Sequence, residues 1–222
     1  LAEYLIKEYL RKDKNIAISG GSTPIGLFNE ILNQIDKKFK IKSNFFWVDE
    51  RCVDPSSTDS NFGSANKHFL SKVNISNNNI FRIRGEEKPE IEASYYTELL
   101  KTKTEIINNI PSLDLCLLGI GGDGHTASIF PHELKKLSDK TDCVVGINPE
   151  SGQKRVSLSI KQINNSKEVI FHVCGSGKKD IVDMIISKRD NYLDLPASHI
   201  LPKSKNLSWY LDFDSAETFM GT

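Results

Sequence analysis

Short apolar runs alternate along the chain with longer segments whose apolar residues recur every three or four positions. The runs have the length of buried strands, and the longer segments have the period of amphipathic helices. The pattern predicts strands over residues 15–19, 44–48, 80–83, 113–118, 143–147, 155–159, 169–174 and 207–211. It predicts helices over residues 24–33, 61–70, 89–108 and 179–187, and a solvated loop over residues 135–142.

This alternation is typical of an α/β fold with right-handed crossovers. The run at residues 113–118 is apolar at nearly every position, as expected of a central strand covered on both faces. We therefore expect one α/β domain over residues 1–222, with a modified doubly wound, Rossmann-like, mostly parallel sheet flanked by helices. Ligands bind beyond the carboxyl ends of such strands. The first nine residues already have helical spacing, so we expect a short segment to precede them in the natural chain.

The charge of the chain is balanced, with 29 Lys and Arg residues against 29 Asp and Glu residues. This balance gives no indication of a nucleic acid or a membrane surface as a partner. No run approaches the ~20 apolar residues of a membrane span, and no signal peptide is visible. The four cysteines lack C-x-x-C spacing and are interpreted as small core side chains in a reducing compartment. We expect a cytoplasmic monomer or homodimer.

The first candidate for chemistry is the sequence SGGSTP, residues 19–24, where a strand meets a helix. Gly20 and Gly21 allow positive φ and close approach of the backbone. Ser22 or Thr23 can cap the helix, and the following proline suits its first turn. The free amides of such a turn form an anion site, although a capped turn without a ligand would have the same sequence.

Charged residues also lie at the ends of three other strands. Asp49, Glu50 and Arg51 directly follow the run at residues 44–48. Arg155 begins the sequence RVSLS, and Lys178 lies in a further junction that contains glycine. Each of these is also what an ordinary strand end looks like. Together with the SGGSTP turn, Arg155 and Lys178 would form a phosphate pocket if the sheet brings them together.

The loop LGIGGDGHTASIFP after the central run contains G-x-G-x-x-G, formed by Gly119, Gly121 and Gly124. A dinucleotide-binding pattern belongs on the first strand of its unit, with an acidic residue ~20 positions later. This one lies past the middle of the chain, and Asp123 would repel a pyrophosphate. The alternative is that the turn aims Asp123 and His125 at one cavity, since histidine is the commonest general base near neutral pH. A capping aspartate beside an incidental histidine is the third interpretation.

The motifs SGGSTP, VDERCVDPSSTDSNFGSA, LGIGGDGHTASIFP, RVSLS, GSGK and LPASHIL follow in an order and spacing that resemble the 6-phosphogluconolactonase family. The resemblance covers about residues 19–209, and the combination of motifs is specific where each one alone is not. It implies a modified doubly wound α/β fold and hydrolysis of 6-phospho-D-glucono-1,5-lactone to 6-phosphogluconate, the second step of the oxidative pentose phosphate pathway. It implies neither a metal nor a cofactor.

The resemblance also implies roles for individual residues. His125 would be the general base that activates water, and Asp123 the partner that orients it. The residues that match phosphate or substrate contacts are Gly20, Gly21, Ser22, Thr23, Arg51, Arg155 and Lys178. Asp49 and Asn61 lie in matching motifs without an assigned role. Amides of the glycine loop or Arg51 would hold the oxyanion of the tetrahedral intermediate.

Two other functions fit part of the pattern. Aminosugar-phosphate deaminases resemble this chain around the phosphate loop and the DGH sequence, but they carry a glutamate five residues after the histidine, where this chain has Phe130. Phenylalanine cannot transfer a proton, which favours the lactonase. A non-catalytic sugar-phosphate sensor would not need the Asp123–His125 pair, and the DNA-binding segment that accompanies such sensors is not visible in this sequence.

Overall fold

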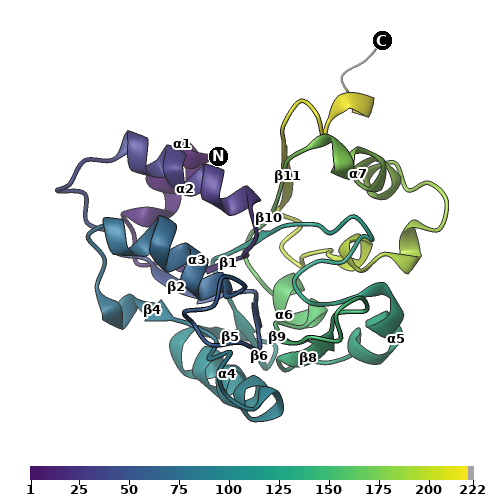
Figure 1. Cartoon of the computed structure of the whole chain (residues 1–222), viewed down its shortest axis with the longest axis horizontal. Coiled ribbons are helices and arrows are strands. Elements are labelled where there is room, and N and C mark those ends of the chain that lie inside the picture. Colours follow the sequence, from purple (N-terminus) through teal and green to yellow (C-terminus); the bar gives the residue numbers. More distant parts are fainter. Residues whose placement is uncertain (220–222) are drawn as a thin grey trace.

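The computed structural model describes residues 1–219. Its centre is a parallel sheet in the order β11-β10-β7-β1-β2-β4 (Figure 1). The strands are β1 (Asn15–Ile18), β2 (Asn44–Trp47), β4 (Ile80–Phe81), β7 (Leu115–Leu118), β10 (Val169–Val173) and β11 (Leu207–Leu211). All residues of β7 are buried, as expected for a strand covered on both faces. The predicted α/β fold with a mostly parallel sheet is confirmed.

Helices pack around the strands of the molecule. They are α1 (Ala2–Leu5), α2 (Thr23–Gln34), α3 (Asn61–His68), α4 (Pro89–Lys103), α5 (Leu134–Leu137), α6 (Ile160–Asn164) and α7 (Lys179–Ile186). A π-helical turn, Ile6–Leu10, continues α1. Figure 1 shows α1, α2 and α3 together beside β1 and β2, whereas α7 lies near β11. Within residues 1–219, no helix has both the length and the apolar character needed to span a membrane.

Two of the predicted strands lie outside the parallel sheet. β8 (Val144–Ile147) and β9 (Lys154–Ser157) form a separate antiparallel sheet with β3 (Asp49–Arg51), in the order β3-β9-β8. For residues 49–51 the sequence predicts only a charged segment that follows a strand. In the structure these residues form β3 and pair with β9 instead of continuing along the parallel sheet. This pairing places Arg51 directly opposite Arg155.

The predicted helix over residues 89–108 is too long. α4 ends at Lys103, and the chain continues as a hairpin of β5 (Glu105–Ile107) and β6 (Ile110–Ser112). The turn residues Asn108 and Asn109 have φ of 53° and 60°, a conformation that asparagine tolerates and that two-residue hairpins require. The loop predicted over residues 135–142 is also partly wrong, because it begins within the single turn of α5.

The strand order places a topological switch at the centre of the sheet. The chain passes from β1 through β2 to β4 towards one edge, and from β7 through β10 to β11 towards the other. The connections after β1 and β7 therefore diverge and open a crevice between them. Doubly wound sheets bind their ligands in such a crevice.

Candidate active site

A cavity of about 250 Å³ opens at the carboxyl ends of β1, β7 and β10. The antiparallel sheet and the start of α3 complete its wall. The predicted site residues that line it are Gly20, Gly21, Ser22, Thr23, Asp49, Arg51, Asn61, His125, Arg155 and Lys178. The remaining predicted residue, Asp123, contacts His125 from outside the wall. The fold therefore brings together motifs from both halves of the chain.

The Asp123 carboxylate holds the His125 ring in place. Asp123 Oδ1 lies 2.5 Å from His125 Nδ1 and accepts a hydrogen bond from the His125 amide at 3.1 Å. Burial alone would raise the pKa of Asp123, but the charge of His125 and the hydrogen bonds from its amide and ring bring that pKa below its ordinary value. Asp123 is thus placed to accept the Nδ1 proton, which leaves Nε2 as the ring nitrogen for chemistry.

Two glycines give this loop the space that the imidazole needs. A Cβ on Gly121 would lie 2.1 Å from His125 Nδ1, so only glycine fits against the ring. Gly124 has a φ of 78°, and a Cβ there would lie 2.8 Å from Cδ2 of Leu195. Close packing on His125 and Leu195 therefore explains Gly121 and Gly124, whereas a Cβ on Gly119 would meet nothing within 4 Å.

Phe130 packs against both the histidine and one of the arginines. Its buried ring has its centroid 4.8 Å from that of His125, and the Arg155 guanidinium carbon lies 5.5 Å from the same ring. An aromatic ring in this position supports the imidazole by packing. Phe130, which stands where the deaminases carry a glutamate, therefore also forms part of the packing around His125.

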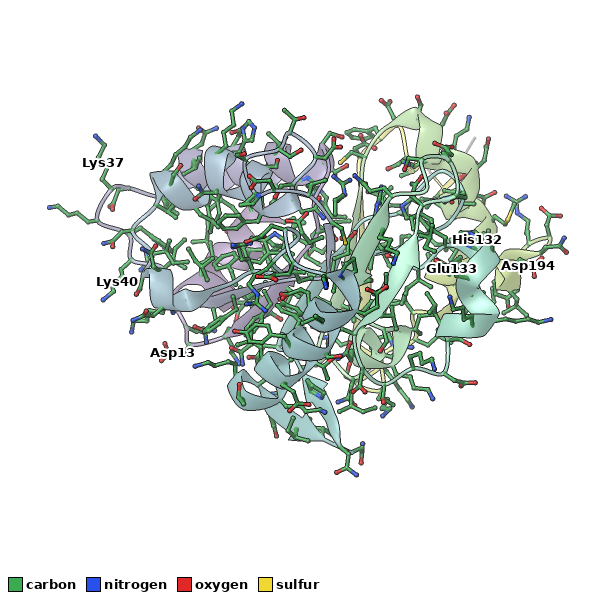
Figure 2. All side chains as sticks on the ribbon, turned by 60° about the horizontal axis from the view of Figure 1, so that its bottom comes forward. Asp13, Lys37, Lys40, His132, Glu133 and Asp194 are labelled. Carbon is green, nitrogen blue, oxygen red and sulfur yellow. The ribbon has the colours of Figure 1, made fainter. Side chains whose placement is uncertain are left out.

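The loop that carries His125 is tied to the antiparallel sheet. The Ser128 amide donates to the Ser157 hydroxyl at 3.1 Å. A few residues later, Glu133 Oε2 accepts a hydrogen bond from the Ile147 amide at the end of β8, at 2.8 Å. Figure 2 shows His132 and Glu133 next to each other beside α5, at the side of the molecule. These contacts hold the end of the loop against β8 and β9.

The SGGSTP sequence forms the turn between β1 and α2. Gly21 has a φ of 94°, and Thr23 and Pro24 are the first residues of α2. Ser22 occupies the N-cap position, but its side chain makes no capping hydrogen bond. Pro24 has no N–H, and the Ile25 amide donates to the Ser22 carbonyl at 3.2 Å, so the donors left for an anion are the amides of residues 20–23, which line the cavity. The turn thus has the features of an anion site.

Three cationic side chains line the same cavity. Lys178 lies just before α7, after a turn in which Gly175 has a φ of 97°. Arg51 donates from Nη1 to the Asp59 carbonyl at 2.5 Å. Burial lowers the pKa of Arg155, and the charge of Arg51 lowers it further. Two half-buried guanidinium groups on adjacent strands repel each other, and a bound anion would relieve this repulsion.

A hydrogen-bond network links the antiparallel sheet to α3. Asp49 is buried, and its Oδ2 accepts from the Ser128 hydroxyl at 2.6 Å. Asn61 Nδ2 donates to the Asp49 carbonyl at 2.9 Å and to Asp49 Oδ1 at 3.3 Å. Burial raises the pKa of neighbouring Glu50, although hydrogen bonds from backbone amides oppose this rise. Asp49 and Asn61, to which the motifs assign no role, are therefore joined to each other in the cavity wall.

Two residues of the wall cannot be identified from the motifs. His172 and Cys174 lie at the end of β10, with Cys174 Sγ 3.6 Å from His172 Nε2. The interpretation of Cys174 as a core side chain is wrong, because it is only partly buried and lines the cavity. Burial lowers the pKa of His172 and raises that of Cys174, so burial favours the neutral form of each. His172 and Cys174 flank buried Val173 along the chain. In a strand such alternate residues face the same side, and this spacing is the sequence signal that could have placed both in one wall.

The chain matches the family model for glucosamine-6-phosphate isomerases/6-phosphogluconolactonase over residues 2–209. It is 38% identical over 193 residues to a 6-phosphogluconolactonase of Treponema pallidum, covering 85% of this chain and 78% of that protein. It is 37% identical over 215 residues to a 6-phosphogluconolactonase of Haemophilus influenzae, covering 95% of this chain and 89% of that protein.

A solved structure supports the same relationship. The crystal structure of the devB protein matches with a TM-score of 0.90 at 37% identity, covering 98% of this chain and 94% of that chain. The resemblance inferred from the motifs is thereby confirmed. The chain belongs to the glucosamine-6-phosphate isomerase/6-phosphogluconolactonase family.

Proposed function

We propose that the chain hydrolyses 6-phospho-D-glucono-1,5-lactone to 6-phospho-D-gluconate in the oxidative pentose phosphate pathway. The observation that carries this proposal is one cavity that combines a histidine–carboxylate pair with a glycine turn at a helix N-terminus and three cations. The relatives from Treponema pallidum and Haemophilus influenzae bear the name of this activity. The four cysteines are free thiols, which supports a reducing compartment such as the cytoplasm as its location.

His125 is the general base of the proposed reaction. A lactone is an activated ester, so its hydrolysis needs a positioned water molecule, a base and a donor for the oxyanion. His125 Nε2 takes a proton from water as the water oxygen attacks the lactone carbonyl. Asp123 keeps the other ring nitrogen protonated and stabilises the imidazolium ion. The bond from the carbonyl carbon to the ring oxygen then breaks, and the ring oxygen takes the proton from His125.

The oxyanion of the tetrahedral intermediate needs a hydrogen-bond donor. In the glycine loop, the Gly121 amide donates to the His125 carbonyl at 2.8 Å, and the Gly124 amide donates to the Gly121 carbonyl at 3.0 Å. The His125 amide is bonded to Asp123. These three amides are occupied, and we assign the oxyanion to Arg51, which lines the cavity and has five N–H donors, one of them bonded to the Asp59 carbonyl.

The phosphate group of the substrate is assigned to the turn at residues 20–23. The amides of this turn lie at the positive end of the α2 dipole, and Arg155 and Lys178 supply charge in the same cavity. Anchoring the phosphate there would fix the distance from that end of the substrate to His125. The carbonyl would then be presented to the activated water without a further search for orientation.

Acid release from freshly generated 6-phosphogluconolactone tests this proposal. In a weakly buffered solution with a pH indicator, the protein should release acid faster than the spontaneous reaction does. No acceleration at high protein concentration would reject the lactonase. Ammonia release from glucosamine 6-phosphate would instead indicate a deaminase, against which the buried Phe130 beside His125 argues.

A further inference from the structure

Glu50 is a buried charged side chain of this region that the proposed reaction does not use. It is 2% exposed and lies in the middle of β3, between two residues that line the cavity. Alternate residues of a strand face opposite sides. The side chain of Glu50 therefore points away from the cavity, towards α3, whose Asn61 and Phe62 amides donate to it.

Each carboxylate oxygen of Glu50 accepts two hydrogen bonds. Oε1 accepts from the amides of Asn61 at 2.7 Å and Arg51 at 2.8 Å. Oε2 accepts from the Phe62 amide at 2.7 Å and the Ser60 hydroxyl at 3.1 Å. Amides in the first turn of a helix have no acceptor within that helix, and a carboxylate suits this positively polarised end. Glu50 therefore fixes the start of α3 against β3.

The residue fixed in this way reaches the proposed phosphate turn. Asn61 Nδ2 donates to the carbonyl and the side chain of Asp49, and these two acceptors determine which end of the amide is the oxygen. Asn61 Oδ1 then lies against Gly20, where a Cβ would be only 1.8 Å from it. Asn61 is itself 2% exposed. Such close packing leaves Gly20 no room to move towards α3.

We propose that Glu50 is a positioning residue for the phosphate turn, acting through Asn61 on Gly20. This inference rests on the proposed function, because it takes residues 20–23 as the phosphate site. Glu50 does not touch the reacting atoms, and His125 lies on a different loop. Loss of the Glu50 carboxylate should therefore weaken the binding of the phosphate end more than it slows the chemical step.

Glu50→Gln tests the inference with almost no change in size. It replaces one carboxylate oxygen by an NH2 group. An NH2 group in place of Oε1 would face two amide donors, those of Arg51 and Asn61. In place of Oε2 it would face the Phe62 amide, whereas the Ser60 hydroxyl can turn to accept from it. At least one backbone amide therefore loses its acceptor. We expect the affinity for 6-phosphogluconate to fall about tenfold and KM for the lactone to rise by a similar factor. The change in kcat should be smaller than about threefold.

The experiment measures 6-phosphogluconate binding by isothermal titration calorimetry, together with kcat and KM for the lactone. The variants are Glu50→Gln, Asn61→Ala and the double variant. Asn61→Ala keeps the backbone amides that Glu50 binds, so it tests the contact with Gly20 even if Glu50→Gln fails to fold. Glu168→Gln is the matched control, because Glu168 is also buried and accepts hydrogen bonds from Tyr4. It lies just before β10, at the amino ends of the parallel strands, whereas the cavity lies at their carboxyl ends.

If Glu50 acts through Asn61, the two substitutions are not additive, and the affinity of the double variant for 6-phosphogluconate equals that of the single variant that binds it more weakly. Glu168→Gln should bind 6-phosphogluconate like the wild type. Additive losses would overturn the inference, as would wild-type binding by Asn61→Ala. A lower kcat with unchanged KM and unchanged binding would overturn it as well. If the wild-type protein neither binds 6-phosphogluconate nor hydrolyses the lactone, the proposed function fails instead.

Discussion

Gly121→Ala tests the placement of the His125 ring with a single added methyl group. Neither Gly121 nor Gly122 has a positive φ, so alanine adds no left-handed backbone strain at either position. At Gly121 the new Cβ would lie 2.1 Å from His125 Nδ1 and 2.6 Å from Asp123 Oδ1, whereas nothing lies within 4 Å at Gly122. An ordinary van der Waals contact begins at 3.4 Å. The imidazole must therefore move by about 1 Å or more, and its contact with Asp123 is disturbed as well.

A misplacement of about 1 Å can lower a rate by about 10²-fold, so we expect kcat of Gly121→Ala to fall by ~10²-fold. KM should change little, because the proposed phosphate turn lies on another loop. Gly122→Ala is the matched control and should stay within about twofold of the wild type. Initial rates of acid release at several lactone concentrations give both constants, and thermal unfolding checks that both variants fold. A Gly121→Ala protein with the Tm and kcat of the wild type would refute the placement of His125 as the base.

Three further predictions concern the proposed base, the proposed phosphate site and a partly buried carboxylate, Asp114, far from both. His125→Ala should lower kcat by ~10²–10⁴-fold, the usual effect of removing a general base; near-wild-type turnover at saturating lactone would exclude it from the mechanism. Lys178→Ala should raise KM more than it lowers kcat, because Lys178 would bind phosphate in the ground and transition states alike; steady-state kinetics with an unchanged KM would place the phosphate elsewhere. Burial opposes ionisation of Asp114, but hydrogen bonds from the Asn15 amide and Lys14 lower its pKa below the ordinary value. The ionised Asp114 therefore stabilises the folded protein fully above the ordinary pKa of about 3.9, and this contribution is lost as pH falls through the lower pKa of the folded state. The Tm of Asp114→Asn should lie below that of the wild type at pH 7, and the difference should shrink in acid. A Tm difference independent of pH would contradict the role of the ionised carboxylate.

Much of the candidate site can be predicted because its parts are local signals. The turn at Gly20 and Gly21 and the junction before Lys178 are each recognised from adjacent residues. The rule that parallel strands end at one edge of the sheet then places both junctions at the same edge. The contact between Asp123 and His125 is different. It depends on the conformation of a loop whose glycines permit many backbone paths, so a spacing of two residues does not determine whether the side chains meet.

The antiparallel sheet could not be distinguished from the parallel one by its sequence. The runs at residues 143–147 and 155–159 have the same apolar character as the strands of the central sheet, because periodicity and composition report burial and not the partner strand. The facing positions of Arg51 and Arg155 are a consequence of that pairing. Their shared electrostatic environment therefore follows from the register of two strands that are distant in the sequence, and it becomes visible only in the structure.

The charged triplet of β3 shows how strand geometry separates binding from positioning. Asp49 and Arg51 line the cavity, whereas Glu50 lies between them and bonds to the start of α3. Alternation along a strand requires this division, so the triplet cannot act as one charged cluster on a ligand. On the proposed function, substitution of Arg51 should affect a group assigned to the substrate, whereas substitution of Glu50 should act through Asn61. Neighbouring charges in one motif are thus expected to give different kinetic effects, and their adjacency in sequence is no measure of a shared role.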